Sequence, residues 1–145
     1  MELKGAVQGT CLYLGLYFCG FIGFQSFSKF YLMKQKKAQA KMEGKRIRFV
    51  EVKYYNRDDK LALCGDRTVG NFLEMGFLFL PLFWIHALFV DPSQSFTIAA
   101  LYTFTRALYP FVFWSAKIPL LLCSTVPGYL IYAYLLLSVA HSTLL

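Results

Sequence analysis

The sequence predicts an all-α protein: an integral membrane four-helix bundle that occupies residues 1–145 as one domain. Of the 145 residues, 57% are hydrophobic and 19% are aromatic, which is too apolar for a typical soluble domain. Four apolar runs are each long enough for a membrane span, which needs ~20 residues. Most of the net charge of +7 lies between the first two runs, as the positive-inside rule predicts for a cytosolic loop.

The first span is predicted over residues 6–33 and is rich in small residues. Glycines recur in it and beside it, at Gly5, Gly9, Gly15, Gly20 and Gly23. Small residues let helix backbones approach closely in lipid, so one face is predicted to pack against other helices. The alternative is that glycine is simply common in membrane helices.

Residues 34–66 form the predicted basic loop. Ten Lys and Arg residues lie between positions 34 and 60, against four acidic residues. This excess places the loop on the cytosolic side, or on the equivalent side of an organelle. Nucleic-acid binding is disfavoured because the basic run lies between two membrane spans. Residues 49–55 alternate in polarity, which predicts a short extended stretch at the surface.

The second span is predicted over residues 67–90. Asp66 is the predicted N-cap, because its carboxylate suits the positive end of the helix dipole. Pro81 removes a backbone donor and predicts a kink in this helix. His86, which is surrounded by apolar residues, is expected to be a satisfied structural group rather than a ligand.

The third and fourth spans are predicted over residues 96–114 and 118–140. Pro110 is expected to end or bend the third helix, and Lys117 returns the chain to the basic side. The turn before the third span, residues 91–95, contains no Lys or Arg. Four spans therefore put both termini on the non-cytosolic side.

The composition also argues against several functions. The four cysteines form no CxxC pair and no Cys/His ligand spacing, so no metal site is predicted. The chain lacks a Ser/His/Asp set, an HExxH motif and a Gly-rich phosphate loop. No cleavable signal and no transit peptide are evident. The predicted location is the endoplasmic reticulum or an organelle membrane, mitochondrial or plastid.

Two polar stripes interrupt the apolar spans, each with the spacing i, i+4, i+7 of one helix face. Their residues are Arg67, Asn71 and Glu74 in the second span and Tyr102, Arg106 and Tyr109 in the third. At 1.5 Å per residue, Glu74 lies about 10 Å and Arg106 about 12 Å below the same surface. An uncompensated arginine in a membrane costs about 2.5–3.5 kcal/mol. The two stripes are therefore predicted to face a shared, partly wet pocket.

Such a pocket suits a small zwitterionic or anionic ligand. Two arginines offer forked donors to carboxylates, and a glutamate accepts from an ammonium group. A thiol beside an arginine has its reactive thiolate stabilised, which makes Arg106 the candidate catalytic group. The alternative is a closed structural network with nothing bound, in which Glu74 pairs with Arg106 or Arg67.

The sequence resembles the MAPEG family, the membrane-associated proteins in eicosanoid and glutathione metabolism. The pattern Arg67-x-x-x-Asn71-x-x-Glu74 at the start of the second of four spans is similar to the family signature. Residues 101–109, in which Arg106 is followed by Tyr109, are similar to the third-helix motif of the family. The length, the number of spans and the basic first loop agree as well.

The resemblance implies a homotrimer of four-helix subunits, with glutathione held as co-substrate between neighbouring subunits near the cytosolic face. The glutathione contacts that it implies are Arg67, Asn71 and Glu74 from the second span and Arg106 and Tyr109 from the third. Tyr102 joins this set from the stripe alone. Family enzymes conjugate glutathione to lipophilic electrophiles, reduce lipid hydroperoxides or isomerise prostaglandin endoperoxides, and some members bind lipid without catalysis.

Two departures from the family pattern bear on catalysis. In leukotriene-synthase-like members a further arginine activates the thiol, but residues 111–122 here contain Lys117 and no Arg. Met75 stands where some members have a tyrosine. Two hypotheses therefore stay open. The favoured one is a glutathione transferase or peroxidase that acts on lipophilic small molecules from the membrane lipid. The alternative is a non-catalytic lipid-binding or scaffolding subunit of a larger membrane complex.

Overall fold

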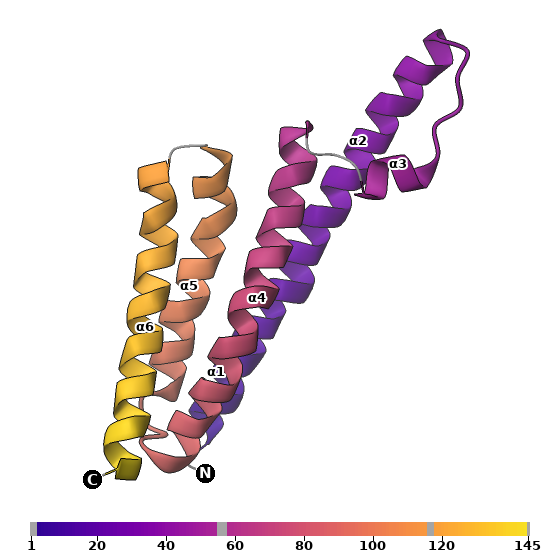
Figure 1. The fold of residues 1–145 in the computed structure, drawn as a ribbon. Helices are drawn as coiled ribbons and strands as arrows, with labels where there is room; N and C mark the ends of the chain where they lie inside the picture. The colour runs from indigo at the N-terminus through magenta and orange to yellow at the C-terminus, as the bar shows by residue number, and fades with distance from the viewer. Residues whose placement is uncertain (1–2, 55–57, 116–117, 145) are drawn as a thin grey trace.

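Long helices account for nearly all of the computed structural model, which describes residues 3–54, 58–115 and 118–144. Lys117 lies outside the described residues. Figure 1 shows the long helices side by side, with the two termini at one end. In order, the elements are α1 (Lys4–Gly15), the π-helical segment η1 (Leu16–Phe21), α2 (Ile22–Met42), α3 (Phe49–Tyr54), α4 (Lys60–Phe89), α5 (Ser95–Trp114) and α6 (Ile118–Leu144). Four stretches of the described chain are long and apolar enough to cross a membrane, which confirms the predicted all-α class with helices suited to a membrane bundle.

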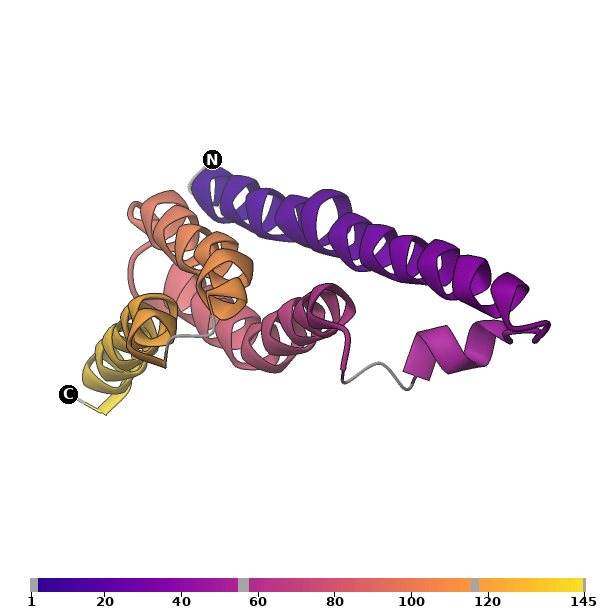
Figure 2. The ribbon, with the colours of Figure 1, turned by 90° about the horizontal axis from the view of Figure 1, so that it is seen from above.

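The first helix is much longer than a membrane span. α1, η1 and α2 run on as 39 helical residues, which is about 58 Å at 1.5 Å per residue. The end of α2 therefore leaves the bundle as an arm (Figures 1 and 2). Residues 34–42, predicted as loop, are helical because Lys, Gln and Ala are strong helix formers. The arm ends at Gly44, whose φ of +67° is the left-handed geometry of a helix C-terminus.

The short helix α3 corrects the prediction of an extended stretch over residues 49–55. α3 folds back against α2, where Val52 is fully buried beside Leu32 and Ala62. Phe49 and Val50 stay exposed on its other side. Burial of Val52 anchors this helix, whereas a strand here would find no other strand among the described residues with which to pair.

The second span begins seven residues earlier than predicted, because its N-cap is a different aspartate. Asp59 accepts a hydrogen bond from the Ala62 backbone nitrogen at 2.7 Å, so α4 begins at Lys60. Asp66 was predicted to be this cap, and that prediction is wrong. The Asp66 carboxylate instead forms an ion pair with Lys29 and accepts from Gln25 Nε2 at 2.9 Å. Asp66 thus ties α4 to α2.

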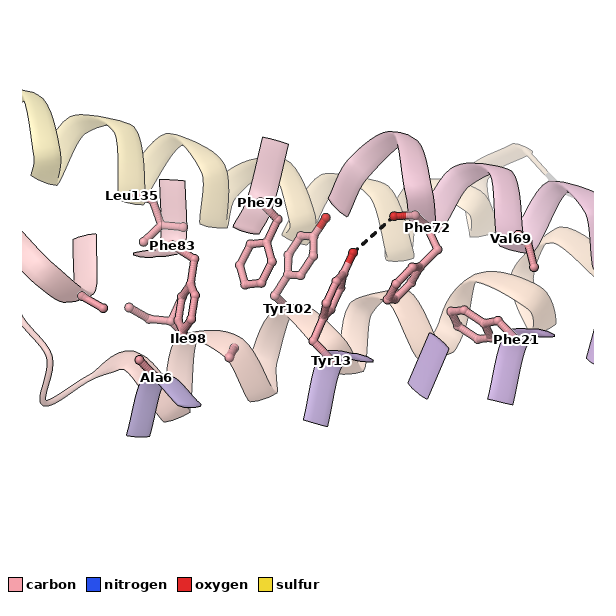
Figure 3. Close-up of a cluster of buried hydrophobic side chains, with 12 residues drawn as sticks. Ala6, Tyr13, Phe21, Val69, Phe72, Phe79, Phe83, Ile98, Tyr102 and Leu135 are labelled. Atoms are coloured by element: carbon pink, nitrogen blue, oxygen red, sulfur yellow. Dashed lines mark hydrogen bonds between the residues drawn. The ribbon is translucent and has the colours of Figure 1, made fainter. Parts of the chain in front are cut away.

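The core is a column of aromatic rings between α1, α4 and α5, drawn in Figure 3. Phe79 and Tyr102 stack with their ring centroids 3.8 Å apart. Tyr13 stacks on Phe72 at 4.2 Å and donates a hydrogen bond to the Phe72 carbonyl oxygen at 3.2 Å. The Tyr13 hydroxyl also fills the space where Gly76 lacks a side chain. Flat rings and small residues together let these helices approach closely.

The glycines of the first span divide into two groups. Gly9 is buried directly against the Ala99 side chain of α5, so the packing hypothesis holds there. At Gly15 and Gly23 an added methyl group would meet nothing within 4 Å. These two glycines therefore agree with the alternative reading, in which glycine has no packing role.

His86 is buried as expected, with only 1% of its surface exposed, and its ring lies 5.6 Å from that of Tyr134. Neither ring nitrogen has a hydrogen-bond partner among the described residues, so the expectation of a satisfied group is not met. Pro81 and Pro110 lie inside α4 and α5, and both helices continue through them. The third helix therefore does not end at Pro110.

The contact between α1 and α5 can be tested at Gly9. We expect Gly9→Leu to lower the free energy of unfolding by about 1–3 kcal/mol, because the new side chain overpacks against Ala99. The measurement is an unfolding titration in mixed detergent micelles. Gly23→Leu is the matched control, since this position is open, and it should leave the titration midpoint unchanged. Equal effects of the two substitutions would contradict the packing role of Gly9.

Candidate functional site

The buried centre of the site is the guanidinium of Arg106 on α5, of which only 2% is exposed. Its Nη2 donates to the Ser124 carbonyl oxygen of α6 at 2.5 Å. Its Nη1 donates to Asn71 Oδ1 of α4 at 3.2 Å, and its Nε donates to Thr105 Oγ1 at 3.3 Å. One side chain therefore links three helices of the bundle.

The partners of Arg106 are neutral groups. Within the part of the chain that the structure describes, Glu74 forms no ion pair with Arg106 or with Arg67. The guanidinium is also 5.3 Å from the centre of the Tyr102 ring, close enough for a cation–π interaction. Arg106 thus donates its hydrogen bonds to a carbonyl, an amide and a hydroxyl oxygen. The closed hydrogen-bond network that was the alternative to a ligand pocket is therefore present, but without the Glu74 carboxylate.

The stripe on α4 faces outward on either side of Asn71. Arg67 and Glu74 are exposed, and Asn71 between them is half-buried. Tyr109 of α5 is 5% exposed, and the Arg67 cation lies close enough to act on its hydroxyl electrostatically. A cation, an amide and an anion therefore follow one another along the outer face of α4, with a tyrosine hydroxyl beside the cation.

Tyr102 lies in the core instead of facing this row. It is fully buried, and its hydroxyl is 2.7 Å from the hydroxyl of Tyr132 on α6. Tyr132 in turn donates to the Met75 carbonyl oxygen. The structure thus brings Asn71 together with Arg106, and Arg67 together with Tyr109, but it places Tyr102 in a separate chain of hydrogen bonds.

Helix α6 contributes residues that the sequence reasoning missed. The carbonyl of Ser124 binds Arg106, the Ser124 hydroxyl donates to the Thr105 carbonyl at 2.6 Å, and Gly128 packs against the guanidinium. Together with Tyr132 these residues are spaced i, i+4, i+8 on one face. That row of small and polar residues in an apolar helix was the signal available in the sequence.

An apolar groove of about 530 Å³ lies between η1, α2, α4 and α5. Cys64 borders it one helical turn before Arg67, and Pro110 borders it directly after Tyr109. The Cys64 thiol lies 3.5 Å from the Pro110 carbonyl oxygen. The other lining residues are Leu16, Gly20, Phe21, Phe24, Leu61, Ala107, Phe111 and Trp114. Apolar walls of this kind suit a lipophilic molecule.

Metal chemistry has no obvious place in the described chain, where no group of three or more His, Cys, Asp or Glu side chains is arranged to hold an ion. The arrangement instead offers charges and hydrogen-bond donors at one end of an apolar bundle. Carboxylates and ammonium groups are the partners that such side chains bind.

The fold defines a membrane protein of four long apolar helices, with a row of polar side chains on α4. The MAPEG family model matches residues 13–141 of the 145-residue chain. The chain therefore belongs to the MAPEG family. Comparison with curated proteins and with solved structures gave no match.

The linking role of Arg106 predicts an asymmetry between the two arginines. We expect Arg106→Lys to lower the free energy of unfolding by about 1–3 kcal/mol, because a single ammonium leaves a buried acceptor unpaired. Arg67→Lys is the matched control at an exposed site and should change it by less than about 0.5 kcal/mol. Unfolding titrations of both variants measure the difference. A larger effect at Arg67 would show that the link is unimportant.

Proposed function

We propose that this MAPEG protein binds glutathione on the outward row of α4 and acts as a membrane glutathione transferase or peroxidase. The single observation that carries the proposal is the placement of exposed Arg67 and Glu74 on either side of Asn71. Arg67 and Glu74 lie seven and fourteen residues after the start of α4, and ionisable side chains within a membrane span are costly to retain without a ligand or a partner.

The chemistry of glutathione matches this row. Glutathione is a tripeptide with two carboxylates, one ammonium group and a thiol. Arg67 suits a carboxylate as a forked donor, and Glu74 suits the ammonium group. The Asn71 amide and the Tyr109 hydroxyl supply neutral hydrogen bonds that fix orientation. Glutathione in this scheme is the co-substrate, and its thiolate attacks the lipophilic electrophile.

The outward direction of the row supports a site shared between subunits. A ligand on the exposed face of α4 is covered on only one side by its own chain, so a second wall has to come from elsewhere. A homotrimer in the endoplasmic reticulum or an organelle membrane, with the basic arm on the cytosolic-equivalent side, supplies that wall from a neighbouring subunit. The lipophilic substrate reaches the row from the membrane along the groove beside Cys64.

One observation favours a second candidate, a non-catalytic lipid-binding or scaffolding subunit of a larger membrane complex. Arg106 was the candidate catalytic group, yet three neighbouring groups occupy its guanidinium. Three of its five N–H donors are used and only 2% of the residue is exposed, so a thiolate has little access to this guanidinium. Arg67 then becomes the arginine that faces the thiol in the catalytic proposal.

Calorimetry on the purified protein tests the binding proposal. We expect wild type to bind glutathione, and Arg67→Ala to weaken binding about 10–100-fold, since a charge-assisted hydrogen bond is worth about 1.5–3 kcal/mol. Glu74→Ala should weaken it similarly. Lys41→Ala, an exposed cation on the arm, is the control and should bind normally. Absence of binding to folded wild type would rule the proposal out.

A titration of thiolate absorbance separates the two candidate functions. If the protein is an enzyme, the bound glutathione thiol should ionise below its ordinary pKa of about 8.5, because Arg67 stabilises the thiolate. The Arg67→Lys variant keeps a charge but lacks the fork, so the thiol should ionise at a higher pH than in wild type. Bound glutathione with an unshifted thiol would favour the non-catalytic subunit.

A further inference from the structure

Because Gly128 on α6 has no side chain, the Arg106 guanidinium can occupy the space beside it. A methyl group built at Gly128 would lie 2.5 Å from Arg106 Nη2 and 3.3 Å from Cζ, closer than side chains pack. The backbone of Gly128 is helical, so its conformation does not require glycine. The tip of a free arginine would simply move away from such a methyl group. This guanidinium is held on α4, α5 and α6 at once, so moving it breaks hydrogen bonds.

The bond from Arg106 determines which way the Asn71 amide faces. A guanidinium carries only donors, so Asn71 must present its Oδ1 to Arg106. The amide nitrogen of Asn71 therefore points away from Arg106. In the described chain it donates no hydrogen bond, which leaves its two N–H groups free in the row formed with Arg67 and Glu74.

We propose that Gly128 is a positioning residue of the ligand site: its missing side chain lets Arg106 hold Asn71 with the amide donors turned outward. The inference rests on the proposed glutathione function and extends it to a helix that touches no ligand. Gly128 acts on Arg106, Arg106 acts on Asn71, and only Asn71 meets the ligand. A larger residue at position 128 displaces the guanidinium, and the Asn71 amide is then free to turn.

A double-mutant cycle on glutathione affinity tests this chain of contacts. Gly128→Ala and Asn71→Ala should each weaken binding about tenfold, and the double variant should also be about tenfold weaker, because both remove the same interaction. Gly23→Ala is the matched control, as a methyl group there meets nothing within 4 Å, and it should bind as wild type does. A double variant about a hundredfold weaker, or wild-type affinity in Gly128→Ala, would overturn the proposal.

The thermal unfolding midpoints of the same four proteins provide a readout that does not depend on glutathione. Asn71→Ala should lower the midpoint less in the Gly128→Ala background than in wild type, because the Arg106–Asn71 bond is already lost. Additive shifts of the unfolding midpoint would overturn the inference whether or not glutathione binds. Absence of glutathione binding, by itself, would reject only the proposed function. If Gly128→Ala does not fold, Arg106→Lys should be less destabilising in that background than in wild type, since the ammonium head needs less room and the Arg106–Asn71 bond is already lost. Equal destabilisation by Arg106→Lys in the two backgrounds, measured in a stabilising lipid mixture in which both fold, would also overturn the inference.

Discussion

The arrangement of the bundle depends on the hydrogen bonds of the buried Arg106 guanidinium. A charge within a membrane is tolerated only when its donors are satisfied. Here a carbonyl of α6, an amide of α4 and a hydroxyl of α5 satisfy them, so the three helices must keep their mutual positions. The Tyr102 ring, which lies against the same guanidinium, extends this constraint into the aromatic core. The packing of the aromatic core and the hydrogen bonds of Arg106 thus require the same arrangement of α4, α5 and α6.

The two arginines of the polar stripes have separate tasks as a result. Arg106 is held by hydrogen bonds inside the fold, whereas Arg67 is exposed near Tyr109. A residue bound on three sides gives rigidity to its neighbours, and an exposed one can change partners when a ligand arrives. The half-buried Asn71 belongs to both settings, because one side of its amide meets Arg106 and the other side is open.

The apolar periodicity predicted four long helices, and the spacing of the stripes predicted that the second and third of them meet through polar side chains. The depth estimate matched Arg106 with Glu74, whereas the structure pairs Arg106 with Asn71, because α4 begins at Lys60 and not at Arg67. These patterns could not tell the inside from the outside of a helix that is apolar all round, so Tyr102 was grouped with ligand-facing residues. They also placed the start of the second helix at Asp66, whereas the cap is Asp59, one of the polar residues that the sequence analysis assigned to the loop. The ion pair of Asp66 with Lys29 depends on how α2 packs against α4, which the sequence pattern does not give. The part played by α6 was missed because Ser124 and Gly128 are neutral and small, so their spacing on one face is a weaker signal than a charged residue.

The π-helical segment η1 gives the first helix an ability that a regular helix lacks. Below it, α1 lies along α5, and above it, α2 lies along α4. A π-turn holds more residues than an α-turn, so it rotates everything that follows about the helix axis. Leu16–Phe21 therefore changes which face of the helix points inward, so one continuous helix packs on α5 before this segment and on α4 after it. Deletion of one residue there would make the whole helix a regular α-helix. The buried face of either α1 or α2 would then be turned away from the helix on which it packs.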